Sequence, residues 1–435
     1  MRVGRTHGRR VVIVDGCRTP FLRSGTGFAD HSAYDLGRHA VAGLLHRNPE
    51  VDPAAVDVLI MGTVIQDPST SNVAREIGLA CGLPPSCPAY TVTVACVSAN
   101  MAFTNAATLI AAGMADVAIA GGTETLSDAP IRVSRAIRKR LIAAQKSKGP
   151  MGLLKHMKGT RFKDLVPEVP AIADFSSGLT MGQNCERLAK RIGISRADQD
   201  AYALMSHQRA ARATREGFLA RQIQPVMAPP EFAPIREDNG IRGDSTIEKI
   251  SSLKPAFDRN FGTVTAANSS FLTDGASAVL LMSEDKARSL GVHPLAALLS
   301  TSVTAMDPLD ELLLGPSFAI PDAIEAAGLT LDDIGVVEIH EAFAAQMVAN
   351  LRLLEDPAFA QTRLNRDRPA GRVEMERVNA WGGSLSIGHP FGATGGRIIT
   401  TCCHRMQQEE AKYGLVAACA AGAIGHAMVL ERVER

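Results

Sequence analysis

Short apolar runs alternate with amphipathic stretches along most of the chain. Apolar runs of roughly four to eight residues are typical of buried strands, and apolar residues that recur about every 3.6 positions are typical of helices. These patterns predict strands at residues 11–15, 56–61, 117–120, 334–339 and 415–419, and helices at residues 33–45, 100–112 and 395–410. Such alternation predicts an α/β fold with a mostly parallel sheet.

The second part of the chain repeats the order of the first. Residues 51–61, an acidic turn followed by an apolar strand, have a counterpart in residues 331–339. The helix and strand that follow Cys96 have a counterpart in residues 395–419. Few residues are identical between the two parts, but the shared order predicts two similar α/β halves.

A segment of different charge lies between the halves. Residues 131–163 hold eleven Lys or Arg and no Asp or Glu, whereas the other 402 residues carry 35 basic and 45 acidic residues. Apolar residues are interspersed among these cations. The segment therefore fits a solvated basic face or a surface for something anionic, whether a nucleotide phosphate, an acidic partner or a membrane. Residues 180–223 are predicted to be helical, with Ser195 as an N-cap, which makes the middle of the chain an inserted helical lobe.

Composition excludes several classes of protein. Hydrophobic residues make up 46% of the 435 residues and charged residues 21%, as in ordinary globular proteins. The formal net charge of +1 argues against a nucleic-acid binder. Neither a membrane span of about 20 apolar residues nor a signal peptide is recognisable, so a cytoplasmic location is expected. The eight cysteines include no Cys-x-x-Cys pair, and free thiols are expected.

Two candidate motifs surround a cysteine and a histidine. Cys96 follows an apolar run and precedes a helix, whose positive N-terminus would lower the pKa of the thiol. His389 lies in the glycine-rich stretch 379–396, where the backbone can approach a ligand closely. This stretch has neither the lysine of a phosphate-binding loop nor the spacing of a dinucleotide fingerprint. Taken alone, a cysteine at a strand–helix junction is more often a packing residue than a nucleophile.

Two further motifs end predicted strands. His340 follows the strand 334–339, but Ala344 stands where a zinc-protease motif would need a second histidine. Cys419 ends the strand 415–419 before a tight turn. All four motifs lie at or just after the carboxyl ends of predicted strands, where α/β sheets gather their sites. Two thiols and two imidazoles without metal-ligand spacing predict covalent acyl chemistry and no metal.

These motifs resemble those of the thiolases, and within them the long-chain 3-ketoacyl-CoA thiolases of the fatty-acid β-oxidation trifunctional complex. The resemblance runs almost end to end, from Val12 to Ala427. Its strongest pieces are Thr-Val-Thr-Val-Ala-Cys-Val-Ser-Ala-Asn at 91–100, Gly-Thr-Val-Thr-Ala-Ala-Asn-Ser-Ser at 262–270, the Gly-His-Pro loop at 388–390 and the turn after Cys419.

The resemblance implies a fold and an assembly. The thiolase fold has two βαβαβαββ halves in a five-layered α/β/α/β/α body, with an inserted helical loop domain. Here it would assign residues 1–125 and 250–285 to the N-terminal half, residues 126–249 to the insertion and residues 286–435 to the C-terminal half. Thiolases form dimers or tetramers, and this branch assembles with a hydratase/3-hydroxyacyl-CoA dehydrogenase chain. Coenzyme A and acyl-CoA are substrates, and no bound cofactor is expected.

The resemblance also implies roles for individual residues. Cys96 would be the acylated nucleophile, His389 the base that activates it and Cys419 the general acid and base. His340, which stands where many thiolases carry Asn, would bind the thioester oxygen together with His389, through a water held by His340. The backbone N–H groups of Cys96 and Ala421 would form a second oxyanion hole. Ser270 would lie near the pantetheine of coenzyme A.

Departures from the family pattern leave alternatives open. Ala99 and Ala423 each stand where Gly is common, and Ala423 puts the assignment of the Ala421 N–H in question. The implied activity is cleavage of 3-ketoacyl-CoA by coenzyme A in fatty-acid β-oxidation. The alternatives are an acetyl-CoA C-acetyltransferase that acts on acetoacetyl-CoA or in the condensing direction, a decarboxylating ketosynthase, against which Cys419 argues, and a non-catalytic scaffold.

Overall fold

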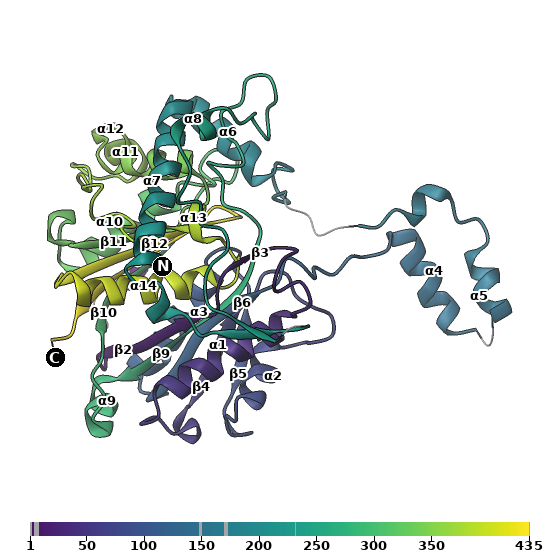
Figure 1. Ribbon diagram of the computed structural model, residues 1–435, viewed down its shortest axis with the longest axis horizontal. Helices are drawn as coiled ribbons and strands as arrows, with labels where there is room; N and C mark the ends of the chain where they lie inside the picture. Colours follow the sequence, from purple (N-terminus) through teal and green to yellow (C-terminus); the bar gives the residue numbers. More distant parts are fainter. Residues whose placement is uncertain (1, 4–7, 148–149, 169–172, 231, 435) are drawn as a thin grey trace.

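The computed structural model describes residues 2–3, 8–147, 150–168, 173–230 and 232–434 (Figure 1). The first half alternates strand and helix as predicted, with β2 (Val11–Arg18), α1 (Ala33–Arg47), β4 (Val58–Gly62), α2 (Val73–Ala80), β5 (Ala89–Val92), α3 (Ser98–Ala111), β6 (Val117–Glu124) and, after the insertion, β9 (Thr273–Ser283). The strands pair in the order β5-β4-β6-β9-β2, parallel among β5, β4 and β6 and antiparallel on both sides of β9. This half therefore has the expected βαβαβαββ order.

The second half repeats the order with one strand reduced. The short helix α9 (Glu284–Leu290) leads to β10 (Ala296–Ala305), α10 (Gly315–Ala327), β11 (Val336–Ile339), α11 (Ala344–Leu354), α12 (Pro357–Arg363), α13 (Ser384–Ile387), α14 (Thr394–Gln408), β12 (Tyr413–Ala420) and β13 (Ile424–Arg432). The counterpart of β5 is a single parallel bridge between Val337 and Val378. Asn379 follows with a φ of 44°, and this left-handed residue ends the extended backbone.

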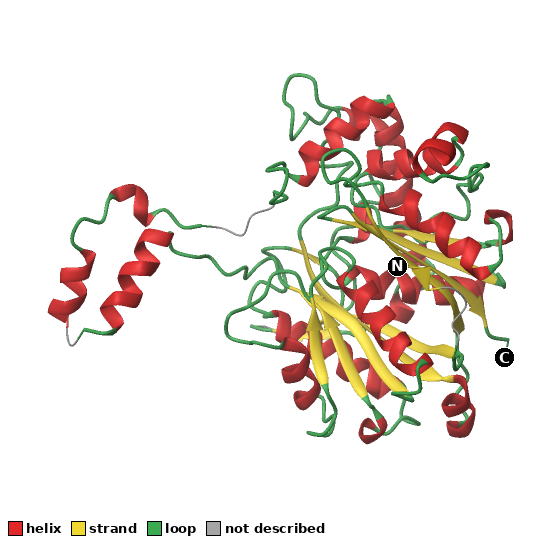
Figure 2. Cartoon of the chain, turned by 180° about the vertical axis from the view of Figure 1, so that it is seen from behind, coloured by secondary structure: helices red, strands yellow, loops and turns green. Residues whose placement is uncertain are grey.

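The two half-sheets enclose a central layer of two helices. Residues of α3 and α14, such as Phe103 and Ile398, share one buried core with inward-facing residues of both half-sheets. On the outer faces, α1 and α2 cover the first half-sheet, and α10 and α11 cover the second. Antiparallel pairing of β10 with β2 joins the half-sheets at one edge. The expected five layers are confirmed (Figure 2).

The insertion contains most of the remaining elements. These are α4 (Arg135–Gln145), α5 (Pro150–Met157), α6 (Met181–Ile192), α7 (Arg196–Arg215), β7 (Val226–Ala228), β8 (Ala233–Ile235) and α8 (Ile247–Ser251). Ser195 caps α7 as predicted, since its hydroxyl accepts the N–H of Asp198 at 3.1 Å. In both views α4 and α5 form an arm that projects from the body (Figures 1 and 2).

The basic segment predicted at 131–163 forms this arm, except that Lys148 and Gly149 lie outside the described residues. No helix in the described part of the chain is long and apolar enough to cross a membrane. The domain boundaries at residues 125, 249 and 285 stay predictions.

Candidate active site

Cys96 lies in a tight turn between β5 and α3. Ala95 has a φ of 46°, and the hydroxyl of Ser98 closes the turn by donating to the Ala95 carbonyl at 2.7 Å and accepting the N–H of Val94 at 2.9 Å. The turn leaves Cys96 half-buried in front of the first turn of α3. The predicted strand–helix junction is thus confirmed.

His389 lies in the loop between α13 and α14. Its N–H donates to the hydroxyl of Thr273 at 2.9 Å, which fixes the loop against the start of β9. Gly388 before it has a φ of 112°, and a Cβ atom there would lie 2.7 Å from the same hydroxyl. A glycine is therefore required at this point of the loop.

His340 follows β11 and is fully buried. Its N–H donates to the carbonyl of Ala417 at 2.9 Å, which continues the pairing of β11 with β12. The next residue, Glu341, ties the loop after β11 to α7 and to Asn379. Its carboxylate accepts the hydroxyl of Ser206 at 2.8 Å and the side-chain amide of Asn379 at 2.7 Å.

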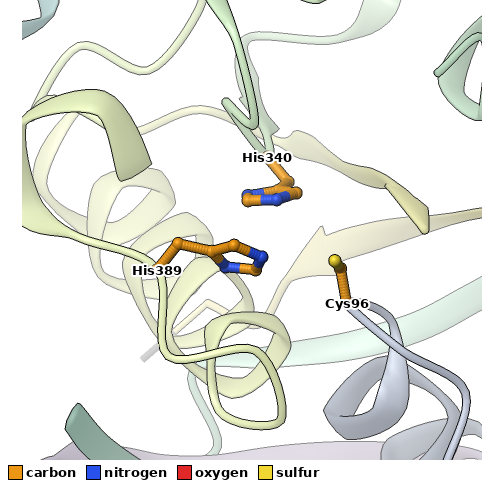
Figure 3. Close-up of side chains that lie close together, drawn as sticks. All are labelled: Cys96, His340 and His389. Carbon is orange, nitrogen blue, oxygen red and sulfur yellow. The ribbon is translucent and has the colours of Figure 1, made fainter. Parts of the chain in front are cut away.

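These three elements bring one thiol and two imidazoles together (Figure 3). The Cys96 sulfur and one ring nitrogen of each histidine lie within 4.8 Å of one another. The ring centroids of His340 and His389 are 4.0 Å apart. Three of the four predicted catalytic side chains thus share one site, although they are up to 293 positions apart in the sequence.

The fourth predicted side chain, Cys419, is the last residue but one of β12 and is buried near Cys96. Burial raises the pKa of its thiol above the ordinary range, and charge on Cys96 raises it further, so the two thiols interact electrostatically. In the turn that follows, Ala423 takes a φ of 56°, as a glycine would. This turn aims the N–H of Ala421 at the Cys96 sulfur. An alanine at 423 is therefore compatible with an Ala421 N–H that faces the Cys96 sulfur.

Two other residues, Ser270 and His426, belong to the motifs at 262–270 and after Cys419. The N–H of Ser270 donates to the carbonyl of Ala342 at 3.0 Å, which places Ser270 beside the loop of His340. His426 points into the core instead, with its ring 2.8 Å from the Thr104 hydroxyl.

Burial keeps the reacting groups uncharged at rest. It raises the pKa of Cys96 to about 11, against the lowering effect of the Ala421 and Cys96 N–H groups. It also lowers the pKa of His389 to about 3, assisted by the charge of Arg397. The expectation of a lowered pKa for Cys96 is wrong, because the loss of hydration outweighs the N–H groups that favour the thiolate. The resting pair is a thiol and a neutral imidazole.

Hydrogen bonds fix which nitrogen of His389 carries the proton. The Thr394 hydroxyl donates to the carbonyl of Pro390 at 3.0 Å and lies 2.6 Å from Nδ1 of His389. We assign the hydroxyl proton to the Pro390 contact, so that Thr394 accepts the proton of Nδ1. Nε2 therefore holds a lone pair, and it has no hydrogen-bond partner among the described residues. His389 can accept a proton from the thiol.

Sequence reasoning missed several polar residues that support the site: Glu124, Ser384, Thr394 and Arg397. The carboxylate of Glu124 accepts the N–H groups of Val64 at 3.0 Å, Ile65 at 2.9 Å and Gly392 at 2.9 Å, and so ties the loop after His389 to the first half. Glu124 ends β6, so the strand-end rule that found Cys96 could have found it. Ser384, Thr394 and Arg397 do not end predicted strands, and no comparable pattern in the sequence marks them.

Comparisons with known proteins agree with this geometry. Residues 11–285 match the model of the thiolase N-terminal domain, and residues 292–432 match that of the thiolase C-terminal domain. The chain belongs to the thiolase family. It is 50% identical over 423 residues to the mitochondrial trifunctional enzyme subunit beta of Bos taurus, covering 97% of this chain and 88% of that one. It is 46% identical over 424 residues to a 3-ketoacyl-CoA thiolase of Yersinia pestis, covering 98% and 97%.

A solved structure extends the likeness to three dimensions. The crystal structure of human mitochondrial 3-ketoacyl-CoA thiolase in complex with CoA superimposes with a TM-score of 0.83 at 30% identity, covering 98% of both chains. As a member of the thiolase family, the protein is an acyltransferase.

The buried carboxylate of Glu124 predicts a pH-dependent stability. Burial raises its pKa from 4.5 to about 7, despite the hydrogen bonds that favour the carboxylate. The folded protein then binds a proton that the unfolded chain releases between these pH values. The free energy of unfolding should therefore fall by about 3 kcal/mol as pH rises through this window. Urea unfolding from about pH 5 to about pH 8 measures the change.

The matched variants isolate this carboxyl group from other titrating residues. Glu124→Gln should remove this part of the pH dependence, whereas Glu376→Gln, at an exposed position, should keep it. Equal slopes in the wild type and Glu124→Gln would contradict the assignment.

Proposed function

We propose that this thiolase is an acetyl-CoA C-acyltransferase that cleaves 3-ketoacyl-CoA with coenzyme A in fatty-acid β-oxidation. The observation that carries the proposal is the pairing of a Cys96 thiol with a His389 nitrogen that can only accept a proton. A second thiol, Cys419, lies beside them. This is the set that a reaction with one covalent acyl intermediate and two proton transfers requires.

In the first half-reaction, Cys96 transfers its proton to Nε2 of His389 and its sulfur attacks the 3-keto carbon. The bond between C2 and C3 then breaks, and its electron pair stays on the acetyl-CoA fragment as an enolate. The Cys419 thiol protonates C2, so that acetyl-CoA leaves. Cys96 retains the shortened acyl group as a thioester, and Cys419 is left as a thiolate.

In the second half-reaction, the Cys419 thiolate takes the proton of an incoming coenzyme A thiol. The coenzyme A sulfur attacks the acyl carbon, and the tetrahedral intermediate collapses to the shortened acyl-CoA. Cys96 leaves as a thiolate and recovers its proton from His389. The N–H of Ala421, which already reaches the Cys96 sulfur, and the N–H of Cys96 would stabilise the oxyanion of this step.

The similarity to a trifunctional enzyme subunit beta supports further proposals about assembly. We propose that the protein forms a homodimer or tetramer and associates with a hydratase/3-hydroxyacyl-CoA dehydrogenase chain. Such a chain would supply the 3-ketoacyl-CoA that this site cleaves. A cytoplasmic location stays a prediction from the sequence, and the Bos taurus relative is named as mitochondrial.

Intact-mass spectrometry tests the covalent step. Incubation with 3-ketodecanoyl-CoA in the absence of coenzyme A should add the mass of an octanoyl group, because Cys96 then keeps the shortened chain. Added coenzyme A should discharge the adduct. Cys96→Ser should form no stable adduct, whereas Cys81→Ser, a free and half-exposed cysteine outside the site, should react as the wild type does. A wild-type protein that forms no adduct would refute the mechanism.

Chain-length kinetics separate the proposed function from an acetyl-CoA C-acetyltransferase. The proposal predicts that kcat/KM for thiolysis of 3-ketododecanoyl-CoA and 3-ketohexadecanoyl-CoA exceeds that for acetoacetyl-CoA by at least about tenfold, since a bound acyl chain adds about 0.8 kcal/mol per buried methylene. A preference for acetoacetyl-CoA would favour the alternative. Condensation of acetyl-CoA, measured under the same conditions, gives the reverse rate.

We further propose that the α4–α5 arm contacts an anionic membrane surface. Exposed apolar side chains, among them Phe162 and Met151, which are 90% and 79% exposed, stand among its cations. Arg138 pairs with Glu168 at 3.1 Å, and Arg140 donates to carbonyls within the arm, so these two arginines hold the arm itself. The exposed lysines remain available for an anionic surface.

Liposome sedimentation tests the arm. Replacing Lys139, Lys155 and Lys163 with Gln should reduce binding to phosphatidylglycerol-containing vesicles about tenfold or more, since each cation near such a surface contributes about 1 kcal/mol. Replacing Lys249, Lys254 and Lys286, which lie outside the arm, should leave binding unchanged. If the arm variant instead raises the Michaelis constant for coenzyme A or loses a partner chain, the membrane role is wrong.

A further inference from the structure

A fully buried arginine lies behind His340. Arg397, on α14, donates from Nη2 to the hydroxyl of Ser384 at 3.1 Å. Its closest carboxylate contact is longer, 4.0 Å from Nη1 to Glu338, and Glu338 already has a 2.8 Å ion pair with Arg405. Nε and Nη1 of Arg397 have no hydrogen-bond partner among the described residues. The hydrogen bond to Ser384 is thus the specific polar contact of this guanidinium.

The hydrogen bond from Arg397 decides how Ser384 bonds to His340. Its hydroxyl lies 3.0 Å from Nδ1 of the ring. A guanidinium can only donate, so Ser384 must accept from Arg397, and its own proton needs another acceptor. Within the described part of the chain, Nδ1 of His340 is the acceptor in reach. Ser384 therefore donates to Nδ1.

The opposite arrangement would leave a buried hydroxyl without an acceptor. If Nδ1 carried the proton, Ser384 would accept from both Arg397 and His340, and its own O–H would be unsatisfied. The penalty for such a group corresponds to a preference of roughly 5- to 150-fold for the arrangement in which Ser384 donates.

The hydroxyl groups beside the two histidines thus have opposite roles: one accepts a hydrogen bond from its ring and the other donates one. Thr394 donates its proton to a backbone carbonyl and accepts from His389, which leaves a lone pair on Nε2 of that ring. Ser384 accepts from Arg397 and donates to His340, which leaves the proton of that ring on Nε2. A threonine and a serine in similar contacts with the rings give one base and one hydrogen-bond donor.

We propose that Arg397 and Ser384 are positioning residues that fix His340 in the neutral form protonated on Nε2, so that its ring donates a hydrogen bond to the substrate oxygen. The assignment of that oxygen rests on the proposed function, whereas the protonation state of the ring does not. Burial lowers the pKa of His340 well below its usual value, with help from His389 and Arg397, so that the ring carries a single proton. That proton must be on one nitrogen or the other.

The position of this proton matters for catalysis. Nε2 of His340 has no hydrogen-bond partner among the described residues, and the ring lies beside His389 and Cys96. A proton there can stabilise negative charge that develops on a carbonyl oxygen. A lone pair there would repel the same oxygen. The relay therefore decides whether His340 assists or opposes the reaction.

Nitrogen NMR of the unliganded protein, labelled with ¹⁵N in its histidine rings, tests the protonation directly. Couplings between ring nitrogens and carbon-bound protons distinguish the two neutral forms, and His340→Asn and His389→Asn assign the two signals by removing them. We expect Nε2 to be protonated in His340 and Nδ1 to be protonated in His389. A proton on Nδ1 of His340, or a mixture of both forms, would overturn the proposal.

Kinetics test the consequence. Ser384→Ala should lower kcat for thiolysis about tenfold with KM changed less than about twofold, and Ser384→Thr, which keeps the hydroxyl, should restore kcat. In a His340→Asn background the amide donates without any choice of protonated nitrogen, so Ser384→Ala should change kcat less than about twofold. Equal losses in both backgrounds would show a merely structural role and overturn the proposal. A wild type without thiolysis activity would refute the proposed function but leave the NMR result standing.

Discussion

The site depends on the contact between the first turns of α3 and α14, the two helices of the central layer. A Cβ atom on Gly395 would lie 2.6 Å from the backbone nitrogen of Asn100, so these turns meet with no space for a side chain. Cys96 directly precedes the first turn of α3, and His389 lies in the loop that leads into α14. Packing of the two halves against each other therefore sets the distance between nucleophile and base. A larger residue at 395 would separate them without touching either.

The same packing removes water and thereby controls the protons. In the layer between two half-sheets, a charged thiolate or imidazolium loses its hydration, and the pKa of Cys96 rises while the pKa of His389 falls. The site thus keeps the Cys96 thiol and the His389 imidazole uncharged. They become charged only when a substrate oxygen is present to take up part of the negative charge. Fixed donors, such as the Ala421 N–H, are already oriented for that moment.

The sequence was sufficient to predict the helices and strands and the candidate site residues at strand ends. Apolar periodicity located β2, α1 and β12 to within a few residues, and the convergence of strand ends explains why Cys96, His340 and Cys419 meet. It could not predict the reduced strand at Val378, because Asn379 shows its left-handed backbone only in the folded chain. Nor could it find Arg397. Its partner Ser384 is a serine that nothing in the sequence distinguishes from other serines. A residue that acts through another is visible only once both are placed.

The relay behind His340 also bears on what else this site could bind. The Cys96 sulfur and two imidazoles, whose ligand atoms lie within 4.8 Å of one another, would suit Zn²⁺ once the thiol is deprotonated, and a closed zinc site would block the nucleophile. Zinc binds imidazole through a nitrogen lone pair, so a ring protonated on Nε2 cannot ligate from that side. With Ser384 donating to Nδ1, His340 offers neither nitrogen without breaking a buried hydrogen bond. The thiol pKa of about 11 adds a second obstacle, because the metal must also displace that proton. The interactions that make His340 a donor thus also keep Cys96 available for acyl transfer.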